Sequence, residues 1–105
     1  MLTELQLTKL YADGVTIVYR RNNPRELKGE FDPGTLEATV YLPTESPEDR
    51  HMTIFHELIH ARDGKKDLRI MEARLDDDVE REAQQTYEKR PELINFIKEL
   101  WELPY

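Results

Sequence analysis

Cysteine is absent from this chain of 105 residues, and only three histidines are present. Without thiols the protein can form no disulfide and can offer no thiolate to a metal, so any metal site needs histidine nitrogens and carboxylates. No apolar run approaches the roughly 18 residues of a membrane span, and the N-terminal sequence lacks the basic and apolar regions of a signal peptide. We therefore expect a cytoplasmic protein without a membrane span.

Basic residues are also scarce, with 15 Lys and Arg against 22 Asp and Glu and a net charge of -7. Nucleic-acid binding requires a basic surface that neutralises phosphates, so we expect no nucleic-acid partner. A chain of this length can bury one modest core. We expect a single domain over residues 1–105.

The hydrophobic pattern predicts an α+β fold. Thr3 and Gln6 have the spacing of a capping box and begin a helix that ends at Asp13-Gly14. Ser46-Pro47 begins a second helix that ends at Asp63-Gly64, and Pro91 begins a C-terminal helix. Between these lie three β-rich runs at residues 15–19, 27–31 and 36–42, and a helical pattern at residues 67–90. We expect the strands to form a mainly antiparallel meander.

The run from Leu36 to Leu42 alternates apolar and polar residues, which is typical of a strand with one buried face. Its even-numbered residues would face the helices. Glu37, Thr39 and Tyr41 would then form the exposed face of the strand.

The second predicted helix carries the motif HELIH, with His56 and His60 four residues apart. Residues at this spacing share one helix face, so the two rings can bind one ion, and Glu57 can lean towards it. Zinc lowers the pKa of a bound water to about 7, and a nearby carboxylate can then take its proton during attack on a carbonyl. The motif predicts one zinc ion per chain and Glu57 as general base.

A catalytic zinc usually has three protein ligands and an open position. His51 lies five residues before His56, about half a circumference from His60 on the helix, and is a poor third ligand. The other candidates are carboxylates of the following helix, from Asp76 to Glu82. The pattern also fits an ordinary amphipathic helix that carries two imidazoles and binds no metal.

HELIH followed by VEREA resembles the gluzincin metallopeptidases, which pair HExxH with a glutamate on a downstream helix. The resemblance implies that Glu80 is the third zinc ligand, whereas Glu82 would point to another side of the helix. The chain departs from the family at Gln84, where an acid often orients a zinc-bound histidine. Tyr87, two turns after Glu80, is a candidate stabiliser of the transition state, although it also fits a core position.

The length and order of elements most resemble the minigluzincins, minimal soluble relatives of the catalytic domains of CAAX-type membrane proteases. The resemblance implies zinc-dependent hydrolysis of a peptide or protein substrate. In such families the strand before the HExxH helix binds extended peptides, so Thr39 and Tyr41 would line the substrate side, unless this is an ordinary edge strand.

The resemblance also suggests that the full chain is a latent form, in which the segment from Trp101 to Tyr105 occupies the cleft. The alternative function is a non-catalytic metal-binding or regulatory domain on the same scaffold. A zinc site with two histidines and a glutamate would also accept cobalt, nickel or manganese.

Overall fold

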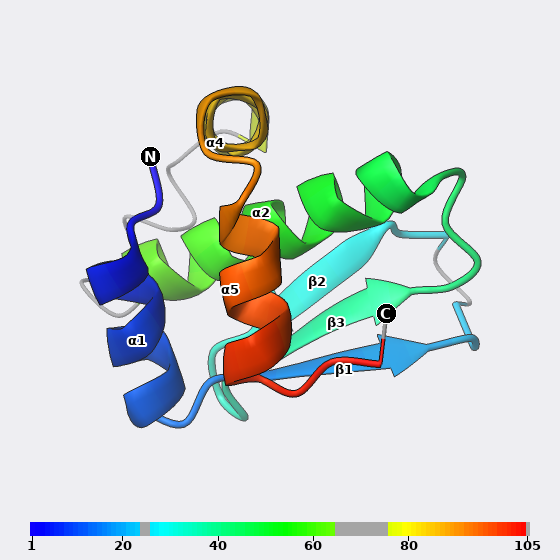
Figure 1. The fold of residues 1–105 in the computed structure, drawn as a ribbon. Helices are drawn as coiled ribbons and strands as arrows, with labels where there is room; N and C mark the ends of the chain where they lie inside the picture. The colour runs from blue at the N-terminus through cyan, green and yellow to red at the C-terminus, as the bar shows by residue number, and fades with distance from the viewer. Residues whose placement is uncertain (24–25, 65–75, 105) are drawn as a thin grey trace.

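The computed structural model describes residues 1–23, 26–64 and 76–104, which form helices packed on a three-stranded sheet (Figure 1). The α+β class predicted from the sequence is confirmed. Residues 67–75 of the predicted third helix and Tyr105 lie outside the described residues. No described helix is long and apolar enough to cross a membrane. The elements are α1 (Glu4–Ala12), β1 (Thr16–Arg20), β2 (Gly29–Asp32), β3 (Glu37–Tyr41), α2 (Pro47–Gly64), α4 (Asp76–Lys89) and α5 (Leu93–Leu100).

The sheet has the strand order β1-β3-β2, so β3 lies in the middle. β1 pairs with β3 in parallel, and β2 pairs with β3 in the antiparallel direction. The predicted meander is therefore wrong, because only the β2–β3 pair is a hairpin. Turn residues mark where a strand ends, as Asp32 does by accepting the N–H of Gly34 at 2.8 Å, but they do not choose a distant partner. The two edges of the described sheet belong to β1 and β2.

The two faces of β3 are occupied differently. Val40 is fully buried in the core, and its partner on β2, Gly29, lies against Thr53 of α2. Since side chains alternate along a strand, Thr39 and Tyr41 point to the opposite face of the sheet from α2.

The expectation that Thr39 and Tyr41 form an exposed face is wrong. They are only 4% and 9% exposed. The Tyr41 hydroxyl donates to Glu30 Oε1 of β2 at 2.8 Å, and Thr39 lies opposite Glu30 in the ladder. Both residues lie on the central strand, on the face away from α2. The predicted substrate role depended on an exposed face, and these two side chains are not exposed.

Helix α2 is the centre of the core. It contacts β2, β3, α1 and α4, and Figure 1 shows it running along the sheet beside β2. Its apolar residues are buried on several sides of the helix because another helix or the sheet packs against each of these sides. The largest fully buried side chains of the protein include Phe55, Leu58 and Ile59 from α2, with Leu7 from α1 and Ile97 from α5.

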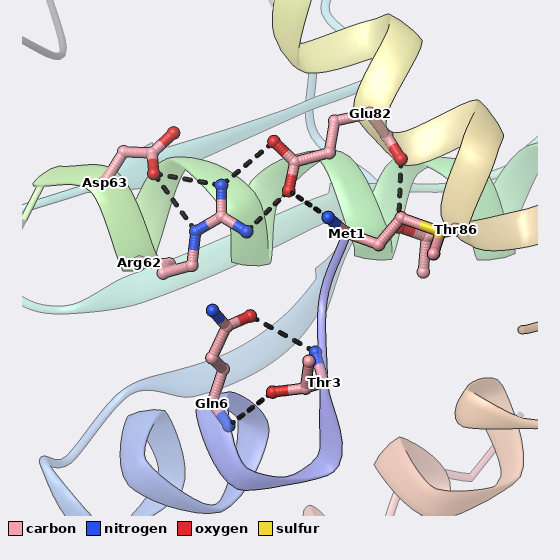
Figure 2. Close-up of polar contacts among 7 residues, drawn as sticks. All are labelled: Met1, Thr3, Gln6, Arg62, Asp63, Glu82 and Thr86. Atoms are coloured by element: carbon pink, nitrogen blue, oxygen red, sulfur yellow. Dashed lines mark hydrogen bonds and ion pairs between the residues drawn. The ribbon is translucent and has the colours of Figure 1, made fainter.

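The predicted capping box at the start of α1 is confirmed. The Gln6 N–H donates to the Thr3 hydroxyl, and the Thr3 N–H donates to the Gln6 side chain, both at 3.2 Å (Figure 2). This cap fixes the direction in which the N-terminal residues enter the fold. Leu2, just before it, is fully buried, and the chain end reaches α4.

Candidate metal centre

The two histidines of HELIH lie on one face of α2, as their spacing predicts. Their Nε2 atoms are 3.1 Å apart, and the ring centroids are 4.8 Å apart. The helix that carries them begins with the Ser46 hydroxyl accepting the Asp49 N–H, and it runs without interruption to Gly64. The regular helix thus brings two ring nitrogens to one point.

This geometry fits a zinc ion. Two nitrogens that each lie about 2.0–2.1 Å from a tetrahedral zinc are themselves about 3.3 Å apart. The observed 3.1 Å between the Nε2 atoms of His56 and His60 is close to that separation. Ligand atoms of His56, Glu57 and His60 all lie within 4.8 Å of one another, which makes this group a possible metal site among the described residues.

Glu57 is only 5% exposed and lies where β2 meets α2. A Cβ atom added to Gly29 would be 3.0 Å from Glu57 Oε2 and 2.7 Å from Thr53 Cγ2. Only glycine lets the strand approach the helix this closely. Gly29 therefore helps to hold the carboxylate of Glu57 beside the histidines, and the sequence interpretation had not singled it out.

Glu80 of α4 reaches the same group from the other side. Its Oε2 atom lies 2.8 Å from Nδ1 of His56, the ring nitrogen that faces away from His60. A carboxylate in this position orients a histidine ligand and fixes its tautomer. The predicted third ligand thus lies at the site, although here it contacts the histidine and is not part of the group of converging ligand atoms.

Glu82, the alternative ligand, is occupied elsewhere. Its carboxylate accepts two N–H groups of Arg62, at 2.5 and 3.0 Å, and lies 3.4 Å from the N-terminal ammonium of Met1 (Figure 2). The hydrogen bond with Glu82 is the largest cause of the raised pKa of Arg62. In this arrangement Glu82 fastens α4 and the N-terminal segment to α2, and the choice of Glu80 as the third ligand stays a prediction.

The third histidine lies away from this group. His51 Nε2 is buried and has no hydrogen-bond partner among the described residues. Burial is the main cause of its lowered pKa, and the charges of Lys98 and Arg50 add to it. His51 does not line the cavity beside His56.

Tyr87 and two residues of the C-terminal segment pack against the core. Tyr87, Trp101 and Leu103 pack against the buried cluster, and none of them lines the cavity beside His56. The Trp101 indole donates to the Val15 carbonyl at 2.8 Å and packs edge-on against Tyr11. These contacts place Trp101 beside α1 and the start of β1. The described part of the C-terminal segment, to Pro104, therefore does not support latency by occupation of the cleft.

A cavity of about 140 Å³ opens beside the histidines and is called the histidine cavity below. It has room for a few water molecules, and polar groups surround it. Its one basic residue among those described is Lys28, which the sequence interpretation had also missed. The lining residues are Lys28, Gly29, Asp49, Met52, Thr53, His56, Glu57 and Glu80.

His56, the buried carboxylate of Glu57 and the exposed carboxylate of Glu80 line one cavity, and the imidazole of His60 lies next to that of His56. Such a set can hold a divalent cation, and the donors alone do not decide which one. Comparison of the chain with protein-family models, with curated proteins and with solved structures gives no match.

Proposed function

We propose that the protein is a zinc-dependent peptidase of the gluzincin type, in which His56 and His60 hold the ion and Glu57 is the general base. The observation that carries this proposal is the convergence of ligand atoms from His56, Glu57 and His60, of which His56 and the buried Glu57 line one small cavity. Burial of a carboxylate costs free energy, and a cation held by the neighbouring histidines would offset part of that cost.

A bound zinc ion would supply the polarisation of the substrate carbonyl and the acidification of a water molecule, which no side chain here provides. Glu57 would take a proton from that water as its oxygen bonds to the carbonyl carbon. It would then give the proton to the amide nitrogen as the carbon–nitrogen bond breaks. Glu80 would hold His56 in the tautomer that presents Nε2 to the ion, and could turn towards the ion as a third ligand because it is exposed.

The substrate would lie along β2, not along β3 as the sequence suggested. β2 is an edge strand of the described sheet, and its first residue, Gly29, lines the histidine cavity. An extended peptide can pair with such an edge through main-chain hydrogen bonds. The scissile bond would then pass close to Glu57.

A second candidate function is a non-catalytic metal-binding domain. It is favoured by the same group of ligand atoms, because Glu57 lies close enough to the histidines to act as a ligand itself. In that case the carboxylate would be bound to the ion and could not accept a proton from water.

Zinc content and peptide hydrolysis of the full chain separate the two functions. A peptidase with Glu57→Gln keeps one zinc per chain and loses hydrolysis by about 10²–10⁴-fold, the usual contribution of a general base. A metal-binding domain with the same substitution loses zinc affinity, and its wild type cleaves nothing in a peptide library.

The matched pair His56→Ala and His51→Ala controls this experiment, because both change one histidine of α2. Loss of zinc only in His56→Ala supports a site at this position. Equal, background zinc in the wild type and both variants would contradict both functions.

A further inference from the structure

Lys28 stands at the border between two cavities. A second cavity, of about 450 Å³, shares Lys28 and Asp49 with the histidine cavity. These two residues therefore lie where the linings of the two cavities meet. The second cavity is lined by Arg21, Asn23, Glu26, Leu27, Lys28, Tyr41, Leu42, Pro43, Thr44, Glu45 and Asp49.

The main chain and the side chain of Lys28 are both held in place. Its carbonyl accepts the Tyr41 N–H at 3.0 Å, which ties it to the end of β3. Its Nζ donates to Asp49 Oδ1 at 3.1 Å, and Asp49 lies on the first turn of α2. The lysine head is thus positioned between β2 and α2, at the mouth of the histidine cavity.

This ammonium group still has donors to offer. A lysine carries three N–H donors, and Asp49 accepts one of them, while the Lys28 side chain is 69% exposed. The hydrogen bond with Asp49 is the main cause of the raised pKa of Lys28, and the charge of Glu80 contributes. Lys28 therefore remains charged at neutral pH and open to a second anionic partner.

In a peptide substrate the anions are carboxylates, so the second anionic partner that Lys28 can bind in such a substrate is a carboxylate. Asp49, Glu57 and Glu80 set three negative charges against the one of Lys28, and a divalent ion would neutralise the excess. Lys28 is then the group beside β2 that can bind an anion through charge-assisted hydrogen bonds. No other described residue that lines this cavity carries a positive side chain.

We propose that Lys28 is a specificity-determining residue that binds a carboxylate of the substrate next to the scissile bond. The proposal rests on the peptidase function proposed above and names the substrate class of that site. The carboxylate can belong to an acidic side chain or to the free C-terminus of a short peptide. Both sources offer the same two oxygens to the ammonium group.

Hydrolysis of matched peptides by the zinc-loaded full chain tests the proposal. One set exchanges Glu for Gln at each position that flanks the cleaved bond, and another set exchanges a C-terminal acid for its amide. We expect the wild type to favour one acid over its amide by about five- to tenfold in kcat/KM, the range of a partly exposed charge-assisted contact. The set that shows the preference identifies the source of the carboxylate.

The variants then assign that preference to Lys28. Lys28→Met should reduce the acid-to-amide ratio to about one, and Lys28→Arg should keep most of it, since arginine also binds carboxylates. Lys9→Met, an exposed lysine of α1, should leave the ratio as in the wild type. An equal ratio in wild type and Lys28→Met would overturn the proposal, as would a wild-type preference for the amides.

Binding without turnover separates this proposal from the peptidase function. The affinity of the zinc-loaded Glu57→Gln protein for the same labelled peptides, with and without Lys28→Met, is measured by fluorescence anisotropy. A Lys28-dependent preference for acids in this variant, together with a zinc-loaded wild type that cleaves none of the peptides, would support the recognition and refute the peptidase function. Hydrolysis of acids and amides at equal rates would refute the recognition alone.

Discussion

Two carboxylates of α4 reach α2, two residues apart in the sequence, and they are held very differently. The side chain of Glu82 is 14% exposed and is gripped by two N–H groups of Arg62, which is itself 16% exposed. Glu80 is 57% exposed, and its hydrogen bond among the described residues is with Nδ1 of His56. The contact between Glu82 and Arg62 can fix the distance between α4 and α2. The carboxylate of Glu80 can then turn without any movement of α4.

The largest expected effect comes from breaking the fixed contact. Glu82→Ala leaves the mostly buried Arg62 without its main partner, so we expect a loss of about 3 kcal/mol in the free energy of unfolding. Urea denaturation measures it, with Glu88→Ala on the exposed side of α4 as the control. The double substitution Arg62→Leu with Glu82→Leu should cost less than Glu82→Ala, because the mostly buried guanidinium is then removed together with its main partner. A Glu82→Ala protein as stable as the control would contradict a fixing role.

A smaller effect is expected where β2 meets α2. Gly29→Ala places a Cβ atom 2.7 Å from Thr53 Cγ2 and from the Thr39 carbonyl, so strand and helix must separate. We expect a loss of about 2 kcal/mol in unfolding free energy, as for overpacked cores, and weaker hydrolysis because Glu57 is displaced. Gly34→Ala in the β2–β3 turn is the matched glycine control. Unchanged stability and hydrolysis in Gly29→Ala would mean that the close approach is not needed.

A change at Glu80, the exposed carboxylate, should weaken metal binding and leave the fold intact. Glu80→Gln keeps the shape of the side chain, so we expect no measurable change in unfolding free energy and about a tenfold weaker zinc affinity, equivalent to about 1.4 kcal/mol. Competition with a zinc chelator measures the affinity, and Glu88→Gln is the control. If Glu80→Gln destabilised the protein as strongly as Glu82→Ala, the two contacts would not differ in kind.

The smallest effect is expected at His51, whose pKa is lowered by burial. In the unfolded chain His51 binds a proton near pH 6.5, whereas in the folded protein it does so only at lower pH. Protonation of His51 therefore favours the unfolded chain, and the protein loses stability as the pH falls below 6.5. His51→Leu should flatten this fall in the metal-free protein, as followed by thermal unfolding from pH 7.5 to 5. Lys98→Met removes a nearby charge and should flatten it less. A steeper fall in His51→Leu would contradict the assignment.

The parts of this protein that follow from short-range sequence were predicted. The capping box at Thr3, the helix around HELIH and the approach of His56 to His60 depend on residues three or four apart. The α+β class follows from the same local patterns. The central place of β3 depends on which strand pairs with which, and local turn signals do not determine a parallel pair.

The missed residues of the site share a different property. Gly29, Lys28 and Arg62 act through neighbours about twenty residues away in the chain, at Thr53, Asp49 and Glu82. None of these three residues is unusual in its own segment of the sequence. The role of each becomes visible only when two elements pack together. A glycine at the start of a strand is itself a sign of close approach, and it was the one available clue.

The hairpin and the helix that follows it have a consequence for how the protein assembles. Residues 28–57 alone supply seven of the eight residues that line the histidine cavity, and Glu80 is the exception. Contacts within such a short stretch close small loops and can form early, whereas the parallel pairing of β1 must wait for β3 to be in place. Most of the cavity is therefore expected to fold as one local unit, and α4 would complete it last by bringing a carboxylate to His56.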